Sequence, residues 1–126
     1  MQVTQDDGGH NRRTGAAGED IAARWFEERG ARVLDRNWRG PSGELDLVVR
    51  HGQTVAVVEV KTRTVTTAGH PFEAITRRKR TRLRRLAAEW CATHPRVARA
   101  SAVRVDAVAV LMVGDHVAVE HLEDIA

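Results

Sequence analysis

Three charged side chains interrupt a stretch that otherwise has the pattern of a β-hairpin, GELDLVVRHGQTVAVVEVKTR over residues 43–63. Asp46 lies in the first arm, and Glu59 and Lys61 lie among the valines of the second. Burying carboxylates and an ammonium among valines is unfavourable unless they are paired, hydrogen-bonded or bound to a metal. The hairpin therefore predicts a functional site built on a sheet.

The turn of the hairpin decides whether Asp46 and Glu59 meet. Gly52-Gln53 fits a two-residue type II′ loop, in which glycine takes the first central position. Counting back along both arms from this loop places Asp46 opposite Glu59, with Cβ atoms about 4.5–5.5 Å apart. Two like charges this close repel, and a divalent cation would relieve the repulsion. A three-residue loop would instead turn Asp46 to the other face.

Length and composition indicate one ordinary domain. The 126 residues suffice for a single core, and we expect a flexible polar tail over residues 1–13 and one domain over residues 14–126. No apolar run has the length of a membrane-spanning helix, and the start lacks a signal-peptide core. The single Cys91 excludes an intramolecular disulfide and a multi-cysteine zinc site. These features predict a cytoplasmic protein without a membrane segment.

Arginine supplies 18 of the 20 basic residues, and Lys61 and Lys79 are the only lysines. An ammonium has a pKa that shifts more readily than that of a guanidinium, so the two lysines are candidates for a site, with chance placement as the alternative. Residues 77–85, RRKRTRLRR, hold seven basic side chains in nine positions, which favours sequence-independent contacts with phosphates. The residues expected to contact nucleic acid are Arg63, Arg77, Arg78, Lys79, Arg80 and Arg84.

Two helices are predicted, one before the hairpin in the sequence and one after it. The first covers residues 14–29, with Thr14 as its N-cap and Gly30 just after its end. Glu19 falls within the apolar arc of this helix, either as a third carboxylate aimed at the sheet or as a first-turn glutamate stabilised by the helix dipole. The second helix lies within residues 72–92. Lys79, at the centre of its buried stripe, either snorkels past the helix end or reaches the site or a bound phosphate.

Further strands are predicted over residues 31–38, 102–113 and 116–122, which gives the order αβββαββ. A crossover through the long helix would set the fourth strand parallel to the third, in a mixed sheet with helices packed on it. Arg104 and Asp106 on the fourth strand predict a local ion pair. The small-residue loop over residues 64–71 is either a lid or a connector.

The set of Asp46, Glu59 and Lys61 suits metal-assisted hydrolysis of a phosphodiester. Carboxylate oxygens select Mg²⁺ or Mn²⁺, which would activate a water molecule and neutralise charge developing on the phosphate. Lys61 would position or deprotonate that water, or stabilise the transition state electrostatically. Only five aromatic residues are present, which argues against a stacking platform for single strands and favours duplex or branched DNA.

The same residues carry a resemblance to known nucleases. Asp46, followed thirteen residues later by Glu59-Val60-Lys61, resembles the PD-(D/E)xK signature of restriction-endonuclease-like nucleases, with Leu45 where the signature has proline. The ordered set along the chain is similar to that of the YraN-type bacterial family, which is related to archaeal Holliday junction resolvases. The matching pieces are Gly18-Glu19, Asn37-Trp38-Arg39, residues 43–47, residues 58–63, Pro71, Lys79 and Arg104-Val105-Asp106.

The resemblance implies a restriction-endonuclease-like α/β fold, αβββαβ(β), with a central mixed sheet flanked by helices. It implies a catalytic set of Glu19, Asp46, Glu59 and Lys61, whose three carboxylates would hold Mg²⁺ or Mn²⁺. It also favours a homodimer, because resolvase relatives act as two-fold dimers on branched DNA.

Two other functions stay open at this point. One is a non-catalytic nucleic-acid-binding module that keeps the fold and serves a partner protein. The other is a structural domain whose buried charges form ion pairs only. The intact set of Asp46, Glu59 and Lys61 counts against the binding module, because a pure binder has no need of it. The sequence does not separate DNA from RNA as the substrate.

Overall fold

The computed structural model describes residues 4–64 and 70–126, with the backbone alone over residues 4–14. Every strand expected from the sequence is present, in the expected order, and two short helical segments, η1 and α3, come in addition. The elements are α1 (Thr4–Glu28), β1 (Arg32–Gly40), β2 (Gly43–His51), β3 (Thr54–Arg63), the 3₁₀ helix η1 (Pro71–Ala74), α2 (Arg77–Thr93), α3 (Pro95–Arg99), β4 (Ala102–Val113) and β5 (His116–Leu122).

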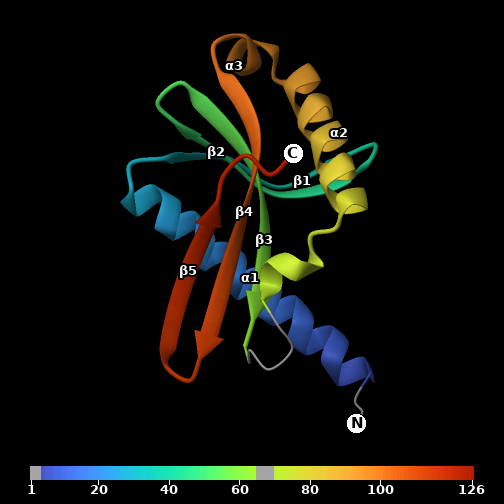
Figure 1. The fold of residues 1–126 in the computed structure, drawn as a ribbon, viewed down its shortest axis with the longest axis vertical. Helices are drawn as coiled ribbons and strands as arrows, with labels where there is room; N and C mark the ends of the chain where they lie inside the picture. Colours follow the sequence, from blue (N-terminus) through green and yellow to red (C-terminus); the bar gives the residue numbers. More distant parts are fainter. Residues whose placement is uncertain (1–3, 65–69) are drawn as a thin grey trace.

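The five strands form one mixed sheet in the order β1-β2-β3-β4-β5. β3 and β4 are parallel, and the other neighbouring pairs are antiparallel. The predicted crossover is confirmed, because the chain leaves β3, passes through α2 and returns as β4. Helices flank the sheet, with α1 packed on one face and α2 on the other (Figure 1).

Each face of the sheet has its own apolar cluster. On the α1 face, Phe26 packs with Val58 and other strand residues. On the α2 face, Leu83 and the fully buried Trp90 pack with Val57. A strand covered on both faces is apolar throughout rather than alternating, which explains the valine run of β3. Charged side chains at the end of that run therefore border a dry interior.

Helix α1 begins earlier than the sequence indicated. The interpretation of Thr14 as the N-cap is wrong, because the helix extends back to Thr4, and a threonine is also tolerated within a helix. The predicted flexible tail falls largely on this helical segment, and residues 1–3 lie outside the described residues. The end of the helix is as expected: Gly30 has a φ of 88°. Its N–H donates to the Glu27 carbonyl, and that of Ala31 to Phe26, both at 3.0 Å, which is a Schellman motif.

Helix α2 begins directly after Thr76, whose hydroxyl accepts a hydrogen bond of 3.2 Å from the main-chain N–H of Lys79. This cap fixes where the helix starts and so fixes the position of Lys79 in its first turn. The loop predicted as a lid or connector lies mostly outside the described residues, at positions 65–69. Among the described helices, none is both long enough and apolar enough to cross a membrane.

Candidate active site

The β2–β3 hairpin has the register that the two-residue loop predicted. His51 pairs with Thr54, and the ladder continues to Leu47 opposite Val58. Gly52 has a φ of 63°, the left-handed conformation that a type II′ turn needs at this position. Asp46 and Glu59 each lie one residue beyond the last pair of this ladder, and their charges interact.

The hydrogen bonding of Asp46 fixes its side chain against β3. Its Oδ2 accepts a bond of 2.8 Å from the main-chain N–H of Val60. The regular alternation of β2 changes at this point, because Leu45 packs in the α2-side cluster whereas Leu47 packs in the α1-side cluster. On β1, Asn37 lies across from Asp46 by register and has a φ of 52°. The irregular pairing leaves the carboxylate at the edge of the core instead of within it.

Both lysines of the chain lie at Glu59. The Glu59 side chain is buried, with 8% of the residue exposed. Its Oε2 lies 3.3 Å from Nζ of Lys61 and 3.9 Å from Nζ of Lys79. Lys61 is two residues along the same strand, whereas Lys79 reaches the site from the first turn of α2. Lys79 therefore points towards Glu59 and not past the end of the helix.

Electrostatics at this cluster favour proton exchange near neutral pH. Burial and the neighbouring charge of Glu59 raise the pKa of Asp46 to about 7, although the hydrogen bond from Val60 opposes the shift. The pKa of Lys79 is lowered, first by its hydrogen-bonding contact with Lys61 and then by partial burial. Groups whose environment moves their pKa values in this way are typical of functional sites.

Helix α1 brings the third predicted carboxylate, Glu19, to the edge of the site. The approach depends on Gly18, where a Cβ atom would overlap the hydroxyl of Thr62. Burial raises the pKa of Glu19, which is half-buried, while the charge of Arg36 and a hydrogen bond from Asn37 oppose the shift. The charge of Glu19 also contributes to the raised pKa of Asp46. Glu19 is therefore directed towards the sheet, and its role as a third ligand stays a prediction.

The carboxylates are close enough to influence one another but do not form a complete metal cage. Among the side chains that the structure describes, in residues 15–64 and 70–126, no three from His, Cys, Asp or Glu converge as metal ligands. Asp46 and Glu59 from adjacent strands are the pair that could hold a divalent cation. Mg²⁺ is commonly bound by one or two carboxylates, with waters and substrate phosphates completing its shell, so the donor set fits this ion.

The predicted phosphate-binding arginines lie near the site but are not in contact with its carboxylates. Arg77, Arg78, Arg80 and Arg84 are exposed on α2. Arg63 is half-buried at the end of β3, where its Nη1 donates a weak bond of 3.4 Å to the Thr62 carbonyl. Sequence reasoning missed two further arginines, Arg82 and Arg85, which line a groove with Arg78. Arg78, Arg82 and Arg85 are spaced at i, i+4 and i+7, which puts them on one helical stripe. This spacing could have identified Arg82 and Arg85 from the sequence.

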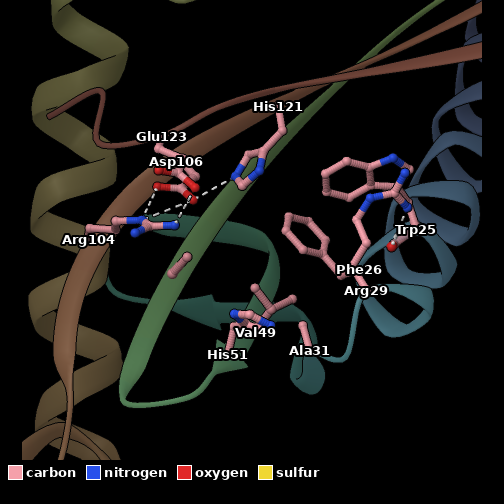
Figure 2. Close-up of a pocket in the computed structure, with 11 residues that line it drawn as sticks. Trp25, Phe26, Arg29, Ala31, Val49, His51, Arg104, Asp106, His121 and Glu123 are labelled. Atoms are coloured by element: carbon pink, nitrogen blue, oxygen red, sulfur yellow. Dashed lines mark hydrogen bonds and ion pairs between the residues drawn. The ribbon is translucent and has the colours of Figure 1, made fainter.

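A second hollow, of about 260 Å³, lies between α1 and the sheet and is lined by His51 of the β2–β3 turn (Figure 2). The Arg104–Asp106 ion pair predicted from the sequence lines it, with Nε of Arg104 2.9 Å from the fully buried carboxylate. That carboxylate also accepts bonds of 2.8 Å from His121 and 3.0 Å from the main chain of Asp124. Burial would raise the pKa of Asp106, but these bonds outweigh it and lower the pKa. Because the polar groups satisfy one another, this network holds the C-terminal segment on β4.

Comparisons with known proteins identify the family. A sequence model of the uncharacterised protein family UPF0102 matches residues 18–110. A UPF0102 protein of Beutenbergia cavernae is 55% identical over 112 residues, which is 88% of this chain and 93% of the relative. One of Renibacterium salmoninarum is 49% identical over 109 residues, which is 86% of this chain and 91% of the relative. The chain therefore belongs to the uncharacterised protein family UPF0102, which confirms the resemblance to the YraN-type family.

Proposed function

We propose that this protein is a Mg²⁺- or Mn²⁺-dependent endonuclease that hydrolyses phosphodiester bonds in DNA. The observation that carries the proposal is the convergence of Asp46 and Glu59 from adjacent strands with Lys61, whose ammonium lies 3.3 Å from Glu59. A structural domain has no need to hold an acid with a pKa of about 7 beside a second, buried carboxylate. The free-energy cost of holding these two carboxylates together is best explained by a role in catalysis.

A divalent cation bound by Asp46 and Glu59 would activate a water molecule and stabilise charge on the phosphate. The two carboxylates repel each other, and the raised pKa of Asp46 records that repulsion together with burial. Binding a cation would remove both the repulsion and the proton. Glu19, at the edge of the cluster, would orient waters around that site.

The lysines supply positive charge on the side of Glu59 next to α2. Lys61 would stabilise the negative charge that grows on the phosphate oxygens in the transition state. Lys79 touches Lys61 and has a lowered pKa. Because its pKa is lowered, Lys79 can lose its proton to solvent, and the resulting neutral amine would accept the proton of the attacking water.

The family resemblance supports the same function. The Asp46 and Glu59-Val60-Lys61 pattern is similar to the PD-(D/E)xK signature, and the mixed sheet flanked by helices is compatible with a restriction-endonuclease-like fold. The likeness of the YraN-type family to junction resolvases favours structured DNA as the substrate and a homodimer that presents two sites. Arginine-rich α2 supplies phosphate contacts that do not depend on sequence.

The alternative is a nucleic-acid-binding module that has kept the fold without turnover. One experiment separates the two. Purified protein is incubated with branched, nicked and linear DNA in Mn²⁺, alongside Glu59→Gln, which keeps the shape of the side chain and removes its charge. The nuclease cleaves at least one substrate, and the variant does not. Equal binding without cleavage by either protein would support the module, and cleavage that survives in the variant would show that the site is misassigned.

A further inference from the structure

We propose that the groove between the β1–β2 turn and α2 seats the sugar-phosphate backbone of duplex DNA next to the carboxylate site. The inference rests on the proposed function for its choice of ligand. The groove has a volume of about 590 Å³ and lies beside the exposed length of α2. Pro41 and Ser42 form one wall, and Arg77, Arg78, Arg82 and Arg85 form the other.

The two walls are held together by hydrogen bonds. The hydroxyl of Ser42 donates to Oε2 of Glu89 at 2.5 Å, and its main-chain N–H donates to Oε1 at 3.1 Å. Gly43, with a φ of 135°, lies beneath the side chain of Arg82, whose Cδ would be 4.0 Å from a Cβ at that position. The turn is therefore attached to the helix, so the groove has a fixed width.

The chemistry of the lining fits a phosphodiester backbone. All four arginines of the helical wall are exposed, and a guanidinium binds phosphate through two parallel hydrogen bonds. Among the described residues, no carboxylate and no aromatic side chain lines this groove. Aromatic stacking is the usual means of holding unpaired bases. A lining of guanidiniums without stacking partners favours contacts with the backbone of a duplex over contacts with bases.

Both walls lead from the groove to the catalytic cluster. Gly43 opens β2, three residues before Asp46 on the same strand. On the other wall, Arg82 follows Lys79 by about one helical turn, and its charge contributes to the lowered pKa of Lys79. Nζ of Lys79 lies 3.9 Å from Glu59. A backbone seated in the groove would continue directly towards Asp46 and Glu59.

The opposite flank of α2 offers a matched comparison. Arg80 and Arg84 line a neighbouring hollow of about 300 Å³, which shares Arg77 and Thr81 with the groove and extends to Ile125. They lie on the same helix and carry the same charge as Arg82 and Arg85, but the β1–β2 turn does not line their hollow. The sequence predicted phosphate contacts for Arg80 and Arg84, and the groove proposal assigns these contacts to Arg82 and Arg85 instead. A difference in DNA affinity between variants of these two pairs would therefore be due to the groove and not to the net charge.

The test compares Arg82→Gln/Arg85→Gln, the groove variant, with Arg80→Gln/Arg84→Gln, the flank variant. Fluorescence anisotropy follows binding of labelled linear duplex over a range of salt, with chelator present so that no cleavage occurs. Each lost phosphate contact lowers the salt slope by about 0.9, so the groove variant should lose about 1.8 in slope and about 30-fold in affinity at 0.15 M salt. The flank variant should lose less than about threefold in affinity for DNA, because it weakens only the overall positive potential of the protein. Thermal melts check that both variants are folded.

Equal losses in the two variants would overturn the proposal, because they would indicate a diffuse basic surface. An unchanged affinity of the groove variant would also overturn it, and so would failure of the unmodified protein to bind duplex at low salt. The experiment measures binding without a divalent cation, so its result is independent of cleavage. An absence of cleavage in the earlier assay would disprove the nuclease while leaving the groove in place.

Discussion

Replacing Asp46 by asparagine should flatten the pH dependence of folding stability in metal-free buffer. In the folded protein, burial and Glu59 raise the pKa of Asp46 from 3.8 to about 7. A raised carboxyl pKa means that the folded state binds the proton more tightly than the unfolded state. Stability therefore falls as the pH rises between these two values and becomes constant above the higher one.

The size of the effect follows from the shift. Each pKa unit corresponds to about 1.4 kcal/mol, so ionising Asp46 costs the folded state about 4 kcal/mol in full. Between pH 5 and pH 8 about 2.5 kcal/mol of this is lost, because titration of the unfolded state has already begun below that window. Asparagine keeps an oxygen that can accept the bond from the Val60 N–H and carries no charge. The variant should therefore be more stable than the unmodified protein at pH 8.

Urea denaturation at four pH values between 5 and 8 measures this difference. The unmodified protein should lose about 2.5 kcal/mol of unfolding free energy over the range, and Asp46→Asn should lose less than half as much. Asp115→Asn, at an exposed residue of the β4–β5 turn, is the control and should keep the original slope. If Asp46→Asn keeps that slope too, the carboxylate is not the strained group, and the electrostatic account of the site is refuted.

Three further predictions concern the elements around the site. Gly18→Ala should lower the free energy of unfolding by about 1–3 kcal/mol in urea denaturation, because the new methyl group overlaps Thr62. Gly15→Ala, with open space around it, should be neutral or stabilising by up to about 1 kcal/mol. Equal effects of the two substitutions would contradict the close approach of α1 to β3. Lys61→Met should slow single-turnover cleavage by at least about 100-fold and weaken DNA binding far less, and a loss of binding alone would contradict its role. Asp106→Asn should lower the free energy of unfolding by about 3 kcal/mol at pH 7 and leave cleavage unchanged. This difference in stability from the unmodified protein should shrink as the pH falls below about 4, because the folded pKa of Asp106 is lowered.

The core of the site could be predicted because local rules determine it. A single glycine, Gly52, sets the hairpin register up to Leu47 and Val58, one residue before Asp46 and Glu59. The position of Lys79 followed from helical periodicity, since it occupies the stripe that faces the sheet. Glu19 had two interpretations from its helix alone, and only its tertiary neighbours, a hydrogen bond from Asn37 and a charge interaction with Asp46, place it towards the sheet.

Other features depend on tertiary contacts that no local pattern contains. The start of α1 at Thr4 was missed because a residue suited to capping, Thr14, is also tolerated inside a helix. The groove on α2 was missed because its second wall comes from the β1–β2 turn, attached through Ser42 and Glu89, which are 47 positions apart. Likewise, the ion pair of Asp106 was predicted, whereas its bond to His121 depends on the strand β5 that packs beside it.

We propose that Asp46 and Glu59 together form a site for a divalent cation. Titration of the protein with Mn²⁺ near pH 6.5, with free Mn²⁺ followed by electron paramagnetic resonance, tests it directly. The unmodified protein should bind Mn²⁺ and release a proton, because Asp46 with a pKa of about 7 is largely protonated before the ion arrives. Asp46→Asn and Glu59→Gln should each lose that binding. Mn²⁺ binding that persists unchanged in both variants, or is absent from the unmodified protein at millimolar concentrations, would contradict the account.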